Sequence, residues 1–477
     1  MGRIRGMRKV SIANKELDIF LGIPYAKPPL GELRFKKPVE IEAYLGEIIA
    51  HSFPKACLQV SGLGGWEHYK RLNMSENCLY LNIWVPISKN LNSEPKGVLV
   101  WIHGGAFASG SSSESRYNGE MIAAHGDVIV VSMNYRLGAM GFLNGGTQDG
   151  PGNMGLYDQN MALRWIRNNI GFFGGNPEMV TLFGESAGGI CVGFHLTSPF
   201  SKGLFKRAII QSGVPNMPTN FNYEQTLKFA QNFAQNANCT SANLNIKRNP
   251  VPIFNCLRSK SPEELLKAEY EVRNEIKLHA LFRPVVGEDF IPYRRLIPLE
   301  PEHINDKDLI IGITSDEGSR FVLDHFSDIM SRTKITKSLA YSAFIQYLEA
   351  TDRWEIMKEK LDAYFRGISE DDYMGVKKAM SALLTDWLFK CPSYEFASLF
   401  SARNNDVFFY YFNHMYSGME MNPDKEWIGV THFEDIQFIF GHSLRSDMIP
   451  NEANYTSNEK KFSLDMIELW SSFAKNG

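Results

Sequence analysis

One short stretch constrains the fold of this chain more than any other, the sequence Gly-x-Ser-x-Gly at residues 184–188 with Ser186 at its centre. The preceding residues, 179–183, form an apolar, β-branched run typical of a buried strand. The following residues, 187–192, are small and apolar, as in a helix packed closely on a sheet. A sharp turn there would expose the Ser186 hydroxyl beside a helix N-terminus, which favours developing negative charge. We therefore expect Ser186 to be a nucleophile, with a coincidental Gly-Ser turn as the alternative.

The rest of the chain repeats this alternation of strands and helices. A helical pattern covers residues 155–170, and near-continuous apolar runs predict buried strands at residues 97–102, 128–133, 207–211, 309–313 and 407–412. Such alternation predicts an α/β fold, a large and mostly parallel sheet with helices on both faces. Residues 214–262 and 334–400 are interpreted as insertions on that core. No linker separates these parts, so we expect one catalytic domain over residues 1–477.

Composition narrows the function classes. The chain has 477 residues and a net charge of −3, which gives no reason to expect nucleic acid or an anionic membrane surface as a partner. No apolar run approaches the ~18 residues that a membrane-spanning helix needs. The first residues contain no apolar signal core.

A second glycine-rich motif complements Ser186. A serine hydroxyl is a weak nucleophile until a base takes its proton, and the oxyanion that forms needs backbone N–H donors. The sequence His-Gly-Gly-Ala-Phe at residues 103–107 follows a predicted strand and matches the loop type that supplies such donors. The expected donors are Gly105 and Ala106, together with Ala187 directly after the serine. A plain glycine-rich turn is the alternative interpretation.

The base and its carboxylate partner are less sharply specified. Asp316 and Glu317 both follow the strand predicted at residues 309–313, and spacing alone does not choose between them. His432 follows the strand predicted at residues 407–412 and gives the chain order serine, acid, histidine. His414 and His442 are rivals for the same role.

Cysteines and glycosylation sequons point to an oxidising compartment. Two cysteine pairs flank short polar loops, and each bridge would contribute about 3 kcal/mol on the chain-entropy estimate. Three Asn-x-Ser/Thr sequons accompany them. The expected bridges are Cys57–Cys78 and Cys239–Cys256, and the sequons are Asn73, Asn238 and Asn454. A secreted or surface location without a signal peptide implies that the N-terminus is incomplete.

Further motifs identify a family. The chain resembles type-B carboxylesterases and cholinesterases, and within them the arthropod acetylcholinesterase-like branch, over nearly its whole length. The resemblance rests on residues 20–26, 76–82, 134–136, 152–159 and 172–177. It implies an α/β-hydrolase fold, a triad of Ser186, Glu317 and His432, the two disulfides above, and no cofactor or metal. It also implies that Cys391 pairs with a cysteine beyond residue 477, and hence that the chain is truncated at both ends.

The same resemblance suggests a substrate pocket. Trp66 matches a tryptophan that holds choline by cation–π attraction, and a partly exposed loop aromatic is the alternative. Leu278 and Ala280 imply a larger acyl pocket than in acetylcholinesterases. A guanidinium at Arg320 would repel a quaternary ammonium unless it turned outward. The expected pocket residues are Trp66, Glu185, Leu278, Ala280, Arg320 and Phe321.

Three functions remain in competition. The first is a general serine carboxylic ester hydrolase that uses an acyl-enzyme and takes a small-molecule ester. The second is a choline-ester-specific enzyme of acetylcholinesterase type. The third, from another class, is a catalytically silent neuroligin-like adhesion protein, which filled triad positions disfavour. The sequence leaves the oligomeric state, membrane anchoring and the physiological ester open.

Overall fold

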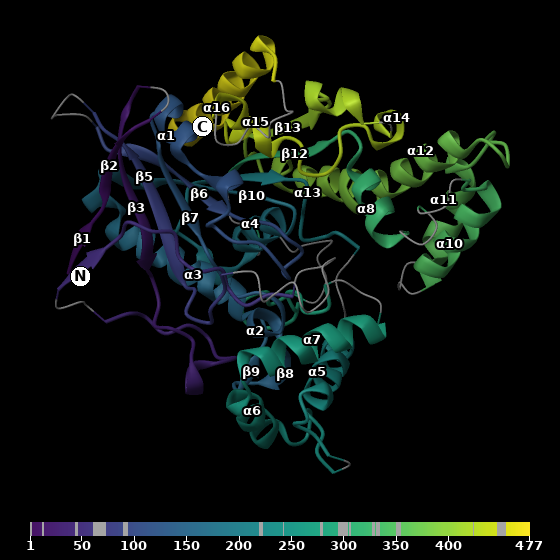
Figure 1. Cartoon of the computed structure of the whole chain (residues 1–477), viewed down its shortest axis with the longest axis horizontal. Helices are drawn as coiled ribbons and strands as arrows, with labels where there is room; N and C mark the ends of the chain where they lie inside the picture. Colours follow the sequence, from purple (N-terminus) through teal and green to yellow (C-terminus); the bar gives the residue numbers. More distant parts are fainter. Residues whose placement is uncertain are drawn as a thin grey trace.

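The computed structural model describes residues 2–11, 14–42, 46–60, 73–88, 94–218, 223–241, 243–276, 280–293, 304, 307–326, 330, 334–349, 354–422, 424–445 and 455–477. Three residues singled out from the sequence, Trp66, Leu278 and Asn454, lie outside this part of the chain. Figure 1 shows the arrangement of the described helices and strands.

A nine-stranded sheet forms the centre of the described structure. Its strands lie in the order β13-β12-β11-β10-β6-β7-β5-β3-β2. The neighbours from β13 to β7 are parallel, whereas β7–β5, β5–β3 and β3–β2 are antiparallel. The strand bounds are β2 (Met7–Val10), β3 (Glu16–Pro24), β5 (Tyr80–Pro86), β6 (Lys96–Ile102), β7 (Ile129–Met133), β10 (Gly175–Glu185), β11 (Arg207–Gln211), β12 (Asp308–Thr314) and β13 (Val407–Phe412). Two-stranded pairs join β1 (Arg3–Arg5) to β4 (Glu47–Ile49) and β8 (Asn144–Thr147) to β9 (Gly150–Pro151).

The central strands are apolar on both sides because a hydrophobic core lies on each face of the sheet. Along β6, Val98 and Val100 belong to one core and Leu99 and Trp101 to the other, since successive side chains point to opposite faces. All four are fully buried. Such strands lose the alternating pattern of a half-exposed sheet and become continuous apolar runs, which is why the sequence predicted them well.

Helices cover the two faces. On one face, α1 and α16 pack together over the strands, as Figure 1 shows near the C-terminus. On the other face, α3, α4 and α13 pack on β10, β11 and β12. The bounds of these helices are α1 (Glu120–Gly126), α3 (Met154–Asn169), α4 (Ala187–Thr197), α13 (Cys391–Ser401) and α16 (Ser457–Asn476). The predicted α/β fold, a large and mostly parallel sheet with helices on both faces, is confirmed.

Five of the remaining helices, α5, α6, α10, α11 and α12, lie in the regions interpreted as insertions, and α7 begins at the last residue of the first of these regions. Figure 1 shows α5, α6 and α7 as one group and α10, α11 and α12 as another, both away from the sheet. The bounds are α2 (Gly138–Phe142), α5 (Tyr223–Asn236), α6 (Pro250–Ser259), α7 (Pro262–Ile276), α8 (Glu317–His325), α10 (Lys337–Glu349), α11 (Trp354–Tyr364), α12 (Tyr373–Leu384), α14 (Lys425–Ile428) and α15 (Ile436–Ile439). The second region differs from expectation at its end, because α13 packs on β12 and β13 and so belongs to the core.

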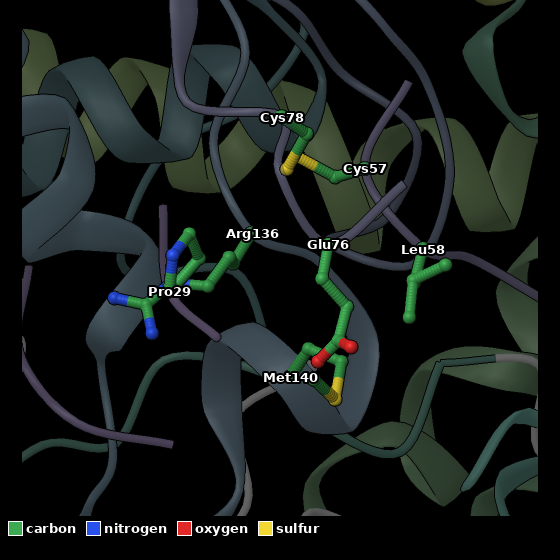
Figure 2. Close-up of a pocket in the computed structure, with 7 residues that line it drawn as sticks. All are labelled: Pro29, Cys57, Leu58, Glu76, Cys78, Arg136 and Met140. Atoms are coloured by element: carbon green, nitrogen blue, oxygen red, sulfur yellow. A yellow bond between two sulfur atoms is a disulfide. The ribbon is translucent and has the colours of Figure 1, made fainter. Parts of the chain in front are cut away.

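Both expected disulfides are formed. Cys57 is bonded to Cys78 and Cys239 to Cys256. The first bridge borders a small cavity that Glu76 and Arg136 also line (Figure 2). Among the described residues no helix is long and apolar enough to cross a membrane.

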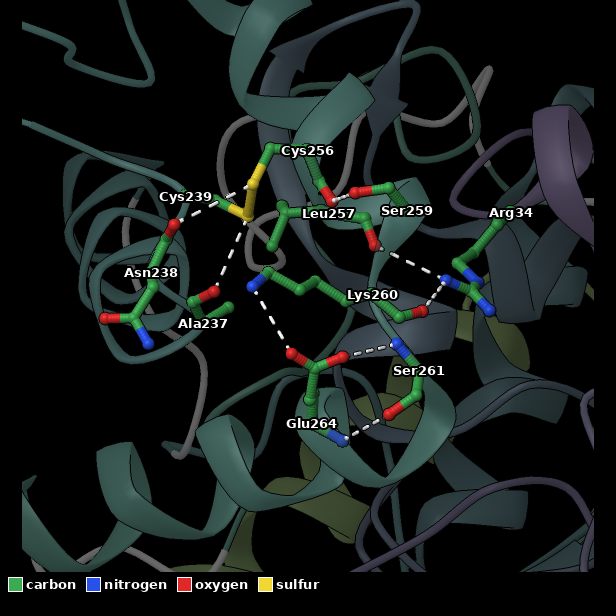
Figure 3. A network of polar contacts seen from close by, with 10 residues as sticks. All are labelled: Arg34, Ala237, Asn238, Cys239, Cys256, Leu257, Ser259, Lys260, Ser261 and Glu264. Carbon is green, nitrogen blue, oxygen red and sulfur yellow. Dashed lines mark hydrogen bonds and ion pairs between the residues drawn. A yellow bond between two sulfur atoms is a disulfide. The ribbon is translucent and has the colours of Figure 1, made fainter.

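A buried arginine ties the two disulfide loops to one another. The Arg34 guanidinium donates two hydrogen bonds to the Glu76 carboxylate, at 2.6 and 2.7 Å. It also donates to the backbone carbonyls of Arg258 and Lys260, just after the Cys239–Cys256 bridge. Figure 3 shows the bond to Lys260 beside this bridge. Because charge-assisted bonds of this kind are the stronger ones, Arg34 fixes the helical insertion to the N-terminal part of the chain.

Candidate active site

Ser186 stands at the sharp turn between β10 and α4. Its backbone has φ 56° and ψ −124°, a conformation that non-glycine residues rarely adopt. Small neighbours make this turn possible, because a Cβ at Gly188 would overlap the Ile102 carbonyl and a Cβ at Gly213 would overlap the Ser186 carbonyl. The Ser186 N–H donates to the Gln211 carbonyl at 2.8 Å, which fixes the turn to the neighbouring strand β11. The predicted strand, turn and helix are all present, and Ser186 is partly exposed.

Glu317 and His432 meet although 115 positions separate them in the chain. Oε2 of Glu317 lies 2.5 Å from Nδ1 of His432, and the carboxylate is fully buried. The other oxygen, Oε1, accepts a hydrogen bond from the Thr314 N–H at 2.8 Å. Glu317 is therefore held from both sides, and its contact directs the imidazole so that Nε2 is the nitrogen left for chemistry.

Asp316, the alternative acid, supports the histidine loop instead. Its Oδ2 accepts a hydrogen bond from the Val430 N–H at 2.9 Å, and its own N–H donates to the Val430 carbonyl at 3.0 Å. Ser319 adds a hydroxyl contact to Thr431 at 2.8 Å. These bonds join the start of α8 to the residues just before His432, which brings the two ends of the Glu317–His432 pair together.

The rival histidines lie elsewhere. His414 is 3.4 Å from Glu459 at the N-terminal end of α16. His442 has Nε2 2.9 Å from the Arg116 carbonyl. Neither contacts Ser186 or Glu317, so the geometry separates His432 from both.

The second nitrogen of His432 faces Glu185. Nε2 lies 3.0 Å from Oε1 of Glu185, the residue directly before Ser186. This Oε1 is buried and accepts no hydrogen bond from the described residues. Glu185 and His432 are therefore close enough for an ion pair, but their atoms are not aligned for a hydrogen bond. Among the described residues none donates or accepts a hydrogen bond with the Ser186 hydroxyl. The imidazole thus contacts the side chain of the residue before the serine. In enzymes without bound substrate, catalytic hydrogen bonds are often long and become short only when the substrate binds.

Burial and charge shift the acid–base groups of this site. Burial raises the pKa of the Glu185 carboxyl, because it disfavours the charged form. Burial also acts to lower the pKa of His432, but the facing carboxylates of Glu185 and Glu317 outweigh it and raise the pKa overall. The imidazole is accordingly a stronger base than a free histidine.

The glycine-rich loop after β6 has the backbone that an oxyanion site requires. Gly105, Ala106 and Phe107 have φ values of 104°, 55° and 60°, so three successive residues lie in the left-handed region. A Cβ at Gly104 would approach Ser186 Cβ to 3.1 Å, which places this loop against the nucleophile. Among the described residues the N–H groups of Gly105, Ala106 and Ala187 have no acceptor. Backbone N–H groups without an acceptor can bind a developing oxyanion.

Two aromatic rings hold the imidazole in place. The Phe321 ring centroid is 5.2 Å from that of His432, in an edge-to-face arrangement, and that of Phe389 is 5.0 Å away. Phe321 was expected at the site from the sequence. Phe389 was not, because it lies in the π-helical turn Thr385–Lys390, far from every recognised motif.

The other expected pocket residues are more scattered. Arg320 turns outward, with 52% of its side chain exposed and an ion pair of 3.1 Å to Asp324. Ala280 is buried, and its carbonyl accepts a hydrogen bond from Arg283 Nε at 2.7 Å.

Sequence reasoning also missed a buried acid beneath the site. Asp435 is fully buried, and its Oδ2 accepts hydrogen bonds from Gln211 at 2.9 Å and from the Tyr410 hydroxyl at 2.8 Å. Burial raises its pKa. The only signal in the sequence is its position three residues after His432. Among the described residues no group of three or more Asp, Glu, His and Cys side chains could hold a metal ion.

Comparisons with known proteins identify the family of this chain. The profile of the carboxylesterase family matches residues 1–477. A cholinesterase from Mus musculus is 36% identical over 503 residues, covering 100% of this chain and 78% of that protein. Acetylcholinesterase-1 from Trittame loki is 35% identical over 484 residues (100% and 85%), and acetylcholinesterase from Bungarus fasciatus is 36% identical over 495 residues (100% and 77%). The chain therefore belongs to the carboxylesterase family, with its α/β-hydrolase fold, and is a carboxylic ester hydrolase that acts on small esters.

Proposed function

We propose that the chain hydrolyses carboxylic esters through an acyl-enzyme formed on Ser186, with His432 as the base and Glu317 as the residue that orients it. The observation that carries this proposal is the contact between Glu317 Oε2 and His432 Nδ1, with Ser186 at the strained turn one residue from the group that Nε2 faces. Serine, histidine and carboxylate in this relationship are the parts that acyl transfer requires.

In the first half of the reaction, the Ser186 hydroxyl attacks the ester carbonyl as Nε2 of His432 takes its proton. The resulting imidazolium is stabilised by the buried Glu317 carboxylate. His432 then gives the proton to the leaving alcohol as the tetrahedral intermediate collapses to the acyl-enzyme. In the second half, water replaces the alcohol and the same groups release the acid.

The oxyanion is bound by backbone N–H groups. Gly105, Ala106 and Ala187 supply them in this proposal, since their N–H groups have no acceptor among the described residues and lie in the loop and the helix end around Ser186. The α4 N-terminus adds the positive end of its dipole. Loss of one such donor generally costs about 10²–10³ in rate.

A general ester substrate is the first candidate and a choline ester the second. The small, buried side chain of Ala280 supports a large acyl pocket. The Phe321 ring packs against His432 and is therefore not free to bind a choline group. The outward ion pair of Arg320 with Asp324 weakens its expected repulsion of a cation. The choline ester remains a candidate because the matching relatives from three animals are named cholinesterase or acetylcholinesterase.

A fluorophosphonate probe tests the mechanism and separates it from an adhesive role. Labelling of the folded protein that disappears in Ser186→Ala supports the acyl-enzyme mechanism. Absence of labelling in folded wild-type protein would favour a neuroligin-like protein without catalysis. The ratio of kcat/KM for acetylthiocholine, butyrylthiocholine and an uncharged naphthyl ester then ranks the two substrate candidates, and a strong preference for acetylthiocholine would favour the second.

We also infer secretion or display outside the cell. Two disulfides and the exposed sequon residues Asn73 and Asn238 support this location. A loss of mass after endoglycosidase treatment of protein from a eukaryotic secretory host would test it.

A further inference from the structure

The reaction itself indicates where the alcohol part of an ester must lie. The leaving alcohol takes its proton from Nε2 of His432, so this part of the substrate lies beside that nitrogen. Nε2 is 3.0 Å from Glu185 Oε1. The groups around this contact therefore form the alcohol side of the site, a conclusion that rests on the proposed function.

Phe433 directly follows His432 in the chain and packs on Tyr117. Burial raises the pKa of the Tyr117 hydroxyl, and Glu185 lies close enough for its carboxyl group to contribute to this shift. The Phe433 backbone has φ 85°, which is rare for a bulky residue and persists only where the surroundings impose it. Its ring packs edge to face on that of Tyr117, with the centroids 6.1 Å apart. Tyr117 is buried with 4% of its surface exposed. Phe433 and Tyr117 thus form a ring pair, separate from Phe321 and Phe389, whose rings contact the imidazole itself.

A cation of the protein already covers the Phe433–Tyr117 ring pair. The guanidinium carbon of Arg116 lies 5.2 Å from the Phe433 centroid and 5.8 Å from the Tyr117 centroid. Both distances are within the range at which a cation is attracted to an aromatic face. Arg116 is held there by an ion pair with Glu114 at 2.7 Å.

The backbone of this segment is also fastened. His442 Nε2 lies 2.9 Å from the Arg116 carbonyl, and Arg445 donates to the Ser115 carbonyl at 2.9 Å. The short helix Ser115–Tyr117 is thereby joined to the segment that follows His432. The guanidinium is consequently held over the ring pair, although 48% of its side chain is exposed.

We propose that Arg116 is a specificity-determining residue, whose guanidinium occupies the aromatic faces of Phe433 and Tyr117 and so disfavours esters whose alcohol carries a quaternary ammonium. A cationic alcohol group would have to displace Arg116 to reach the two rings. An uncharged alcohol group has no such requirement. The site therefore selects esters of neutral alcohols.

The occupied rings, rather than a long-range field, carry this selection. Arg116 and Glu114 form an ion pair at 2.7 Å and together have no net charge, so the double variant Glu114→Gln/Arg116→Gln leaves the local net charge unchanged. Glu185, which faces Nε2 of His432, is the same in all the variants compared and therefore does not account for a change in the ratio of cationic to neutral ester turnover.

The test compares acetylthiocholine with its uncharged isostere, 3,3-dimethylbutyl thioacetate. The readout is the ratio of kcat/KM for the cationic ester to that for the neutral one, within each variant. Arg116→Gln frees the two rings but leaves Glu114 as an unpaired anion. The double variant Glu114→Gln/Arg116→Gln removes both charges and so keeps the local net charge of the wild type. The double variant is therefore the decisive one. Arg116→Lys retains a cation over the rings. Arg167→Gln, which removes another surface arginine that pairs with Glu178, is the matched control.

We expect the double variant to raise the ratio about tenfold, the size of a partly desolvated cation–π contact, with the ratio near the wild-type value in Arg116→Lys and Arg167→Gln. An unchanged ratio in the double variant would overturn the proposal. So would an equal rise in Arg167→Gln.

Failure of the proposed function would be visible separately. If the wild type turned over neither ester and resembled Ser186→Ala, choline itself would serve as the probe, with thermal stabilisation as the readout. Choline that stabilises the double variant more than the wild type still supports the role of Arg116. Equal shifts in melting temperature would overturn it.

Discussion

Nε2 of His432 lies 3.0 Å from Oε1 of Glu185, while its Nδ1 is held by Glu317 at 2.5 Å. One imidazole is therefore placed between two carboxyl groups. The pKa of His432 is raised because these carboxylates outweigh the effect of burial. His432 acts as a base only when it is unprotonated, so the acidic limb of the pH–rate profile should report its pKa. Because Glu185 and Glu317 both influence this pKa, changes to either residue should move the limb.

Replacing Glu185 by Gln should shift that limb toward lower pH. With the Glu185 charge removed, burial and Glu317 remain, and the pKa of His432 in the free enzyme falls. We expect the midpoint of kcat/KM against pH to move down by about one unit, the size expected for loss of one nearby opposite charge. Steady-state kinetics with a neutral naphthyl ester between pH 5 and pH 9 would measure the shift.

A matched variant separates this effect from general damage. Glu434→Gln removes a half-buried carboxyl near the histidine loop, whose own pKa desolvation raises to about 7, without removing a group that contacts His432. A midpoint that moves equally in both variants, or upward in Glu185→Gln, would contradict the assignment of the shift to the Glu185–His432 contact.

Replacing Glu317 by Gln should be far more damaging. The amide cannot stabilise the imidazolium and can present the wrong hydrogen-bonding group to Nδ1, so we expect kcat to fall by about 10³–10⁴ with folding retained. His414→Asn and His442→Asn serve as comparisons, because their histidines contact Glu459 and the Arg116 carbonyl instead. Loss of activity as large in either of these variants would contradict the choice of His432 as the base.

Much of this arrangement could be predicted from the sequence because its signals are local. The strand, turn and helix around Ser186 follow from a buried apolar run and adjacent small residues. The strands β6, β7, β11 and β12 are buried on both faces and so appear as continuous apolar segments. The fold class depends on these segments alone.

What the sequence left open depends on contacts between distant segments. Asp316 and Glu317 follow the same strand, and only the position of the loop at residues 430–432 shows that one binds its backbone and the other its imidazole. No local pattern indicates that Phe433 adopts φ 85° or that Arg116 covers its ring. These features arise because segments more than 300 positions apart pack together.

The glycine-rich loop gives a third prediction. A Cβ at Gly105 would overlap the Ser109 carbonyl, and its φ of 104° disfavours any L-residue. Gly105→Ala should therefore displace the N–H groups of the loop and lower kcat by about 10², the cost of losing one oxyanion donor. The check is kcat on the naphthyl ester, with near-UV circular dichroism to verify the fold.

Gly203→Ala is a suitable control for backbone strain alone. Gly203 also has a left-handed φ, of 80°, but nothing lies within 4 Å of the added Cβ. Its variant should lose some stability and keep its kcat. Equal losses of kcat in the two variants would mean that strain, and not displaced donors, explains the result.

The last prediction concerns the start of α16. Thr456 and Glu459 form a capping box, and Glu459 also accepts hydrogen bonds from the Ser417 N–H and hydroxyl at 2.6 and 2.7 Å. Burial acts to raise the pKa of Glu459, but these hydrogen bonds outweigh it and lower the pKa to about 2. A carboxyl whose pKa is depressed in the folded state stabilises the protein above its ordinary pKa, and the contribution is lost as the pH falls toward the folded value.

Glu459→Gln should thus reduce the free energy of unfolding by about 2 kcal/mol at neutral pH, where the wild-type carboxylate is ionised. The difference from the wild type should shrink as the pH falls from 4.5, the ordinary value for this carboxyl, toward about 2. Urea unfolding at several pH values would measure it. Glu468→Gln, farther along the same helix and outside the capping box, is the matched control and should show little difference at any pH. A difference between wild type and Glu459→Gln that stayed constant across this range would show that the capping carboxylate is not the source of the stability.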